Sequence, residues 1–202
     1  MAQFPNVEWG GVTVAHVQPA VTNKSLSGKR QSLIREVSYW TIEFTTRNYE
    51  YDDLRAVQAF INSLDGMYQP FDVVVPQVSY KRGVASIANG YSNVEVSSVT
   101  DSKTVVLRRL KANVEDCFKA GDLIRFANHS KVYQITESVT SSASGTATVK
   151  LHTALHVSDI TTGTIVIIDA VPFTVQLQRD TQEFSLKPGL ITRVQVNCIE
   201  VV

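Results

Sequence analysis

Residues 120–136, AGDLIRFANHSKVYQIT, contain the pattern that decides the fold of this chain. Gly121-Asp122 forms a turn that enters an apolar run over residues 123–126, and a second run follows over residues 131–136 after a short polar loop. Two such runs separated by a few turn-forming residues are typical of a β-hairpin. In this hairpin we expect Leu123, Ile124 and Phe126 to meet Val132, Tyr133 and Ile135.

Most of the remaining chain shows the two-residue alternation and β-branched clusters of strands. The predicted strands span residues 12–17, 37–46, 71–78, 93–99, 104–110, 123–127, 132–139, 146–151, 163–168, 173–178 and 191–201. Only residues 51–65 have apolar side chains at spacings of three and four, which predicts one helix with a buried stripe. Asp52 and Asp53 suit the N-terminus of this helix, and Gly66 suits the left-handed position that ends it.

The chain changes character twice. Aromatic residues are frequent up to about residue 80, whereas short strands separated by Ser, Thr, Gly and Asn turns follow, a spacing typical of a small barrel or sandwich. Long alternating strands return after about residue 166. The sequence therefore predicts a discontinuous domain of residues 1–80 and 166–202, with residues 81–165 inserted as a separate β-domain. Such insertions need only an exposed loop and chain ends that lie close together.

The overall charge disfavours two classes of partner. The 202 residues carry 19 basic and 19 acidic side chains, a formal net charge of zero. Proteins that bind nucleic acids or anionic membranes usually have a basic excess, and near-neutral proteins tend to associate. The N-terminal residues MAQFPNVEWGG do not resemble a signal peptide, and no apolar run is long enough for a membrane helix. We therefore expect a protein without membrane contact.

The histidines have structural explanations. His152 and His156 are four residues apart, a metal-binding spacing on a helix but not after a strand, where the two rings do not converge. His129 lies between Asn128 and Ser130, where capping of its own turn outweighs a role as base or ligand. His16 ends a predicted strand. We predict no metal site.

The cysteines and carboxylates do not indicate catalysis either. Cys117 and Cys198 lack a neighbouring nucleophile or zinc signature, and two cysteines form no disulfide framework, which fits a reducing compartment. The pair Asp52/Asp53 is explained by helix capping and the pair Glu115/Asp116 by a loop. Phosphate-binding loops and a nucleophile elbow are absent from the sequence. We therefore predict no catalytic residue, no cofactor and no enzymatic activity.

One basic cluster allows two interpretations. Lys103, Arg108, Arg109 and Lys111, with Tyr91 nearby, would suit oligonucleotide binding on a small barrel. The alternative is a solvated strand edge that its charges protect from pairing. Glu115 and Asp116 follow directly and weaken the positive field, so we favour the second interpretation.

The hairpin at residues 120–136 resembles the inserted barrel of the distal tail proteins of siphophages, the bacteriophages with long non-contractile tails. Three further features are similar to the ring-forming domain of that family. They are the aromatic strand YWTIEF at residues 39–44, the single helix followed by PFDVVVPQ at residues 70–77, and the closing strands with Pro172-Phe173 and residues 191–200. The similarity spans most of the chain, although its motifs are structural.

The resemblance implies a mainly β fold, a β-rich α+β class. Residues 1–80 and 166–202 would be a discontinuous β-sandwich-like ring domain with one packed α-helix, and residues 81–165 an inserted small OB-like β-barrel. It also implies a structural tail-tip protein whose ring, usually a hexamer, joins the tail tube protein to the baseplate hub. The chain would lie in the virion, at the phage tail tip, after assembly in the host cytoplasm, with no specific nucleic-acid contact.

Two alternatives to this function remain. One is another tail or baseplate component, and the other is a carbohydrate- or nucleic-acid-binding module that uses the inserted barrel. For the ring we expect pairing between copies through the strands at residues 37–46 and 191–201. We also expect contacts from residues 30–35 and 47–51, because a closed ring needs two different patches on each subunit.

Overall fold

The structure is a computed structural model that describes residues 2–5, 7–34, 37–47, 49–155, 160–180 and 191–202. It divides into two compact units. The first unit comprises Met1–Val73 and Thr174–Val201, and the inserted unit comprises Val74–Phe173. The domain boundaries expected from the sequence, and the assignment of a ring-forming role to one domain, stay predictions.

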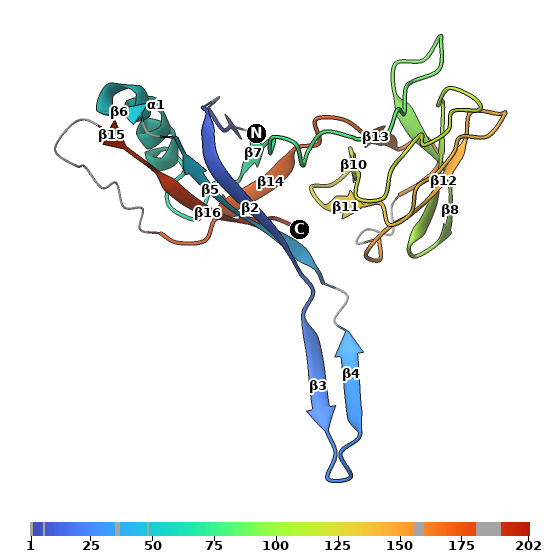
Figure 1. Cartoon of the computed structure of the whole chain (residues 1–202), viewed down its shortest axis with the longest axis horizontal. Helices are drawn as coiled ribbons and strands as arrows, with labels where there is room; N and C mark the ends of the chain where they lie inside the picture. Colours follow the sequence, from blue (N-terminus) through green and yellow to red (C-terminus); the bar gives the residue numbers. More distant parts are fainter. Residues whose placement is uncertain (1, 6, 35–36, 48, 156–159, 181–190) are drawn as a thin grey trace. The chain divides into compact units, whose positions relative to one another are not determined.

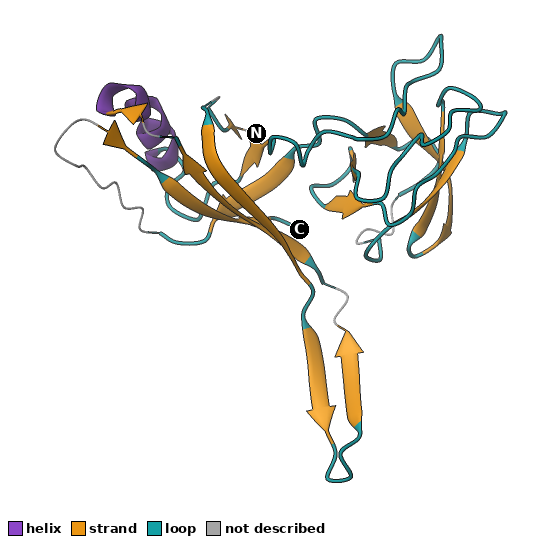
Figure 2. Ribbon diagram, in the orientation of Figure 1, coloured by secondary structure: helices purple, strands orange, loops and turns teal. Residues whose placement is uncertain are grey.

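The first unit is built on one six-stranded sheet of order β1-β7-β14-β16-β5-β2. Its strands are β1 (Ala2–Gln3), β2 (Trp9–Val17), β5 (Tyr39–Thr46), β7 (Phe71–Val73), β14 (Phe173–Leu177) and β16 (Gln195–Glu200), and two short pairs add β3 (Ala20–Lys24) with β4 (Arg30–Ile34) and β6 (Tyr49–Glu50) with β15 (Ile191–Thr192). The pairing of β1 with β7 is parallel, whereas β2, β5, β16 and β14 pair antiparallel. Figures 1 and 2 show the long strands β2 and β5 side by side.

Alternation along the strands separates a buried face of this sheet from an outer face. On β5 the side chains of Trp40, Ile42, Phe44 and Thr46 are buried, and their neighbours are not. Aromatic rings fill the core beneath: Phe44 lies 4.8 Å from Phe4 and 4.5 Å from Trp9 between ring centroids. The sheet therefore has one apolar face to cover.

The helix α1 (Tyr51–Asn62) supplies that cover. Leu54, Val57 and Ile61 form its buried stripe, and the ring of Phe60 lies 5.5 Å from that of Phe71. The predicted helix is confirmed, but it ends three residues early, at Asn62, and turns continue past Gly66 to Tyr68. Gly66 has a φ of 66°, the left-handed conformation expected for it. The side chains of Asp52 and Asp53 lie outside the described part of the chain.

The inserted unit contains a second six-stranded sheet, of order β11-β10-β13-β8-β9-β12. Its strands are β8 (Val94–Asp101), β9 (Thr104–Arg108), β10 (Leu123–Phe126), β11 (Val132–Gln134), β12 (Ala147–Lys150) and β13 (Ile165–Ile167). All the pairings are antiparallel. The end strands β11 and β12 approach at one isolated bridge, between Ile135 and Leu151. The sheet is thus curled without a continuous ladder that would close it into a barrel.

The predicted hairpin is confirmed as β10 and β11, with Ile124 opposite Tyr133 and Arg125 opposite Val132. Ile124, Phe126 and Tyr133 are completely buried in the core of the inserted unit. Gly121 has a φ of 96°, so the turn before β10 needs a glycine. Phe126 pairs with Val166 of β13 instead of with β11, so the loop between the paired residues of β10 and β11 spans residues 126–131.

The β-rich fold class is confirmed, and α1 is the only helix in the described residues. Several strands are shorter than predicted because the pairing, rather than the sequence pattern, sets where a ladder ends; β7 stops at Val73, for example. The hairpin of β3 and β4 was not predicted from the sequence. It buries none of its described side chains, so it has no inside-outside alternation to detect.

Candidate functional site

The described histidines serve local structure. The Nδ1 atom of His129 lies 2.9 Å from Asn128 Oδ1 and its Nε2 atom 3.1 Å from the Tyr133 hydroxyl, which fixes the loop between β10 and β11. His152 Nδ1 accepts a hydrogen bond from the Gln134 N–H at 3.0 Å. The ring of His16 packs on Trp40. His156 lies outside the described residues. Within the described residues, no three His, Cys, Asp or Glu side chains gather as metal ligands would.

Both cysteines are buried thiols. Burial raises the pKa of Cys198 to about 12 and also raises the pKa of Cys117. Because the thiolate is the reactive form, neither environment favours a nucleophile.

We expect the native thiols to resist alkylation. A thiol with a pKa of about 12 is ionised in roughly one molecule in ten thousand at pH 8, and burial further limits access. Iodoacetamide at pH 8, followed by mass spectrometry, should leave Cys198 unmodified in the native protein and modify it fully in urea. The folded protein also holds this thiol proton more tightly than the unfolded chain does. The resulting contribution to the free energy of unfolding is fully present below pH 9 and is lost as the pH rises towards 12. Rapid native alkylation would contradict the burial of this thiol.

Two cations of the basic cluster are paired with a carboxylate that lies outside the cluster in the sequence. Glu95, on β8, is 8% exposed and pairs with Arg108 at 2.8 Å and also with Arg109. The Arg109 guanidinium lies over the ring of Tyr91, 4.9 Å from its centroid. The register of β8 against β9 places Glu95 directly opposite Arg108. Two of the four cations are thus engaged within the fold, which weighs against an oligonucleotide groove.

The turn before β10 is organised around the buried carboxylate of Asp122, which is 1% exposed. Its Oδ1 accepts the Arg82 N–H at 2.8 Å, and its Oδ2 accepts the N–H groups of Gly83 at 3.0 Å and Lys119 at 2.8 Å. A Cβ at Gly83 would lie 2.4 Å from the Cys117 carbonyl oxygen, so only glycine fits there. This carboxylate ties the entry of the inserted unit to its hairpin and has no free oxygen for a ligand.

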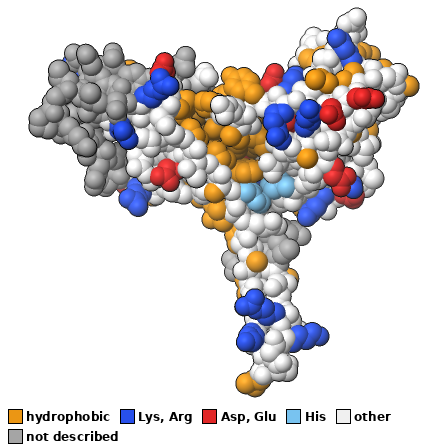
Figure 3. Space-filling view, viewed as in Figure 1, with side chains coloured by type: hydrophobic (Ala, Val, Ile, Leu, Met, Phe, Trp, Pro, Cys, Tyr) orange, Lys and Arg blue, Asp and Glu red, His pale blue; other side chains and the backbone are white. Residues whose placement is uncertain are grey.

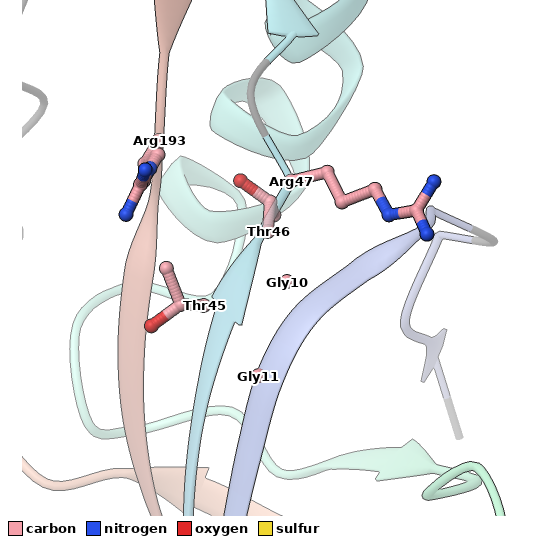
Figure 4. Close-up of a pocket in the computed structure, with 6 residues that line it drawn as sticks. All are labelled: Gly10, Gly11, Thr45, Thr46, Arg47 and Arg193. Atoms are coloured by element: carbon pink, nitrogen blue, oxygen red, sulfur yellow. The ribbon is translucent and has the colours of Figure 1, made fainter.

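A pocket of about 350 Å³ opens at one end of the first sheet, between β2, β5 and the segment before β16. Gly10, Gly11, Thr45, Thr46, Arg47 and Arg193 line it (Figure 4). Arg47 extends across the end of β2, away from Arg193, and pairs with Glu8 at 2.7 Å. Thr46 Oγ1 accepts the Val194 N–H at 3.0 Å. The polar groups therefore do not converge on one point, as a ligand site would require.

The outer face of the first sheet is polar and mostly uncharged. A smaller pocket on it, of about 260 Å³, is lined by residues of β2, β5 and β16 and by Gln178. Glu43 and Gln195 are hydrogen-bonded to each other across the strands. The buried Oδ1 of Asn197 has no hydrogen-bond partner among the described residues. Such a surface suits contact with protein or water better than it suits a small apolar ligand.

The hairpin of β3 and β4, here called the arm, is the most exposed feature of the first unit. Every described side chain from Ala20 to Leu33 is exposed. Figure 1 shows the arm projecting beyond the ends of β2 and β5. Of the stretch predicted to make contacts, residues 30–34 form β4, and Arg35 lies outside the described residues. That Arg30–Arg35 and Arg47–Tyr51 form contacts stays a prediction.

In the described part of the chain, no helix is both long and apolar enough to cross a membrane. A family model described as the B domain of the distal tail protein pb9 matches residues 86–168. This stretch lies within the inserted unit and includes the hairpin of β10 and β11. No curated protein matches the chain. The match covers residues 86–168 and supports the family that the sequence resembles, the distal tail proteins of siphophages.

Proposed function

We propose that this chain is a non-enzymatic adaptor that forms a ring, a hexamer, between the tail tube and the baseplate hub at the tail tip. The match to the distal tail protein B domain supports a structural role in a phage tail and is the observation that carries the proposal. The matched domain interrupts a β-rich unit, the organisation that the resemblance implies for a ring subunit.

The first unit has the features that a ring subunit needs. Strands β5 and β16, which cover most of residues 37–46 and 191–201, each have a partner strand on both sides in the six-stranded sheet, so the expected pairing between copies through them is wrong. The nine-residue strand β2 is the edge strand instead, and no described strand pairs with its outer side, which can accept another chain. The arm lies at a different place on the same unit. Two different patches on each subunit are what a heterologous ring requires, because each contact joins one patch to the other.

The proposed partners follow from the position of the ring between the tail tube and the baseplate hub. The ring would contact the tail tube protein on one side and the baseplate hub on the other, in the virion, after assembly in the host cytoplasm. It would need no cofactor, no metal and no specific nucleic acid. The ion pairs of Glu95 with Arg108 and Arg109 support the last point.

Light scattering and negative-stain electron microscopy of the purified protein test the ring. We expect a mass of six times the 22.3 kDa chain and annular particles. Because such a ring could close only on its neighbours, virions should also be labelled with antibodies against the inserted unit. Label at the tail tip is the expected result. A monomer in solution together with label on the capsid or along the tail shaft would contradict the proposal.

A further inference from the structure

Strand β2 ends the first sheet without the features that usually protect an edge. No described strand pairs with the side of β2 that faces away from β5, here called the open edge. The residues of β2, WGGVTVAHV, include no Lys, Arg, Asp, Glu or Pro, and the pairing with β5 is regular from Gly11 to Val17. Edge strands usually carry charges or prolines because an open edge binds other strands. The open edge is therefore suited to accept a strand.

The buried layer of the first sheet is incomplete at the same place. Phe44 and Ile42 of β5 are fully buried. Val12 and Val14 of β2 lie directly opposite them, on the same face of the sheet, and remain partly exposed. A further strand beyond β2 would remove these valines from water if it carried apolar side chains on this face.

The arm has the face pattern that such a strand needs. Val21 and Leu33 are opposite each other, so they share one face of the arm, and they are 49% and 70% exposed. Figure 3 shows hydrophobic side chains at the surface of the arm. Thr22 pairs with Ser32 on the other face, and the exposed face of β2 also carries small side chains. An apolar face can thus meet an apolar face, and a polar face a polar one.

The arm also lacks support of its own. A two-stranded hairpin alone is at best marginal in water, because it cannot bury enough apolar surface to offset the ordering of its backbone. Its ladder is nevertheless regular from Ala20 to Lys24, and its turn contains Gly28 with a φ of 82°. The arm is therefore shaped as a pair of strands, and addition to a larger sheet would stabilise it.

The described strands offer few other partners for the open edge. The strands with an unpaired side are the sheet ends β1, β11 and β12 and the members of the pairs β3/β4 and β6/β15. Strands β1, β6 and β15 have two residues each, and β11 and β12 approach each other through Ile135 and Leu151. Pairing of β2 with a second β2 would be a twofold contact, which ends with two copies. The five-residue strands of the arm remain.

We propose that the arm of one copy adds a strand to the open edge of β2 in a neighbouring copy, with its apolar face continuing the buried face of the sheet. The arm projects beyond the ends of β2 and β5 of its own chain (Figure 1), so the pairing joins two chains. A five-residue strand covers about 17 Å of the edge. The contact joins two different patches, so its repetition can close a ring. This inference rests on the proposed ring and names the strands that join its subunits.

Cysteine cross-linking between isotope-labelled copies tests the contact. Ala15→Cys places a thiol on the exposed face of β2, and Ser32→Cys places one on the polar face of the arm. The first variant, labelled with ¹⁴N, and the second, labelled with ¹⁵N, are mixed, concentrated and treated with a bismaleimide that bridges neighbouring strands, which lie about 5 Å apart. Cys117 and Cys198 are buried and do not compete. We expect mixed-isotope cross-links between residues 15 and 32.

The control replaces Ser32→Cys with Ser144→Cys, because Ser144 is an exposed serine of the inserted unit. This variant should give no cross-link with Ala15→Cys. Cross-links between two copies of Ala15→Cys would indicate a twofold contact through β2, and cross-links between two copies of Ser32→Cys a contact between arms. Either result without the mixed cross-link, or no cross-link at all, would overturn the proposal.

Matched charge variants test which face of the arm is covered. Leu33→Asp places a charge on the apolar face, where the contact would remove it from water, and should weaken self-association at least about tenfold, a cost of about 1.4 kcal/mol. Ser32→Asp makes the same change on the polar face and should associate nearly like the parent. Urea unfolding should be similar in both because the arm lies outside the core. Equal association of the two variants would contradict the proposed orientation of the arm.

Hydrogen exchange provides a direct readout of strand pairing. The N–H groups of β2 that point towards the open edge should exchange more slowly in the assembled protein than in the dilute monomer. Unchanged exchange over residues 9–17 in an assembled protein would show that the open edge is not used.

The outcomes separate the contact from the ring. A hexameric ring without the cross-link between residues 15 and 32 would overturn the arm contact and leave the ring intact. The same cross-link in a protein that forms dimers or open chains would support the arm contact and count against the closed hexamer.

Discussion

Replacement of Asp122 by alanine is expected to lower the free energy of unfolding of the inserted unit by about 3–5 kcal/mol. The carboxylate is 1% exposed and accepts three backbone N–H groups, from Arg82, Gly83 and Lys119. Each buried donor left without an acceptor costs about 1–3 kcal/mol, and local relaxation recovers part of the sum. Because domains are stable by only about 5–15 kcal/mol, this loss is a large fraction of the total.

Hydrogen exchange measured by mass spectrometry can locate the effect. The segments around residues 82–83 and 119–135 should lose protection in the variant, whereas those of the first sheet should keep theirs. Asp116→Asn is the matched control: Asp116 is an exposed carboxylate 3.5 Å from the Lys119 amine, and its loss should cost less than about 0.5 kcal/mol. Equal protection in the two variants would show that Asp122 does not organise the turn.

Replacement of Phe44 by alanine is expected to destabilise the first unit by about 3–5 kcal/mol. Phe44 is fully buried at the centre of the aromatic core and contacts both Phe4 and Trp9. Truncation removes apolar surface from the core and leaves a cavity that the rigid sheet beneath it can fill only partly. The helix and the sheet should therefore separate at a lower denaturant concentration.

Tryptophan fluorescence during urea unfolding reports on this unit alone, since Trp9 and Trp40 are the two tryptophans of the chain and both belong to it. The midpoint should fall in the Phe44→Ala variant. Tyr68→Ala serves as the control because Tyr68 is 78% exposed, and it should shift stability by no more than about 0.5 kcal/mol. A midpoint for Phe44→Ala within error of the parent would contradict the proposed core.

Most of the secondary structure could be predicted because its signals are local. Alternation marks the long strands β5 and β16, the three- and four-residue spacing marks α1, and Gly121-Asp122 marks the turn before β10. The ends of the strands were less predictable, because the hydrogen bonds between two strands stop where the shorter strand ends. The arm was missed because alternation reveals a strand only when one of its faces is buried.

The candidate sites were predictable only in part. The sequence shows no catalytic pattern around the histidines and cysteines, and it presents Arg108 and Arg109 as free charges. Their partner Glu95 lies 13 and 14 residues away and reaches them only through the pairing of β8 with β9. Likewise, the hydrogen bonds from Arg82 and Gly83 to Asp122 span about 40 residues. No local pattern encodes such contacts.

The sequence by itself thus determined a β-rich chain with one helix and the turn-forming hairpin that resembles a distal tail protein. Periodicity and turn chemistry are properties of neighbouring residues, so they can be read without a fold. Only the tertiary structure decided that Asp122 is a buried acceptor, that Glu95 pairs with two cations of the basic cluster, and that no described residue covers the arm. Burial and ion pairing depend on which segments, distant in the sequence, come into contact, and the register of the paired strands determines these contacts.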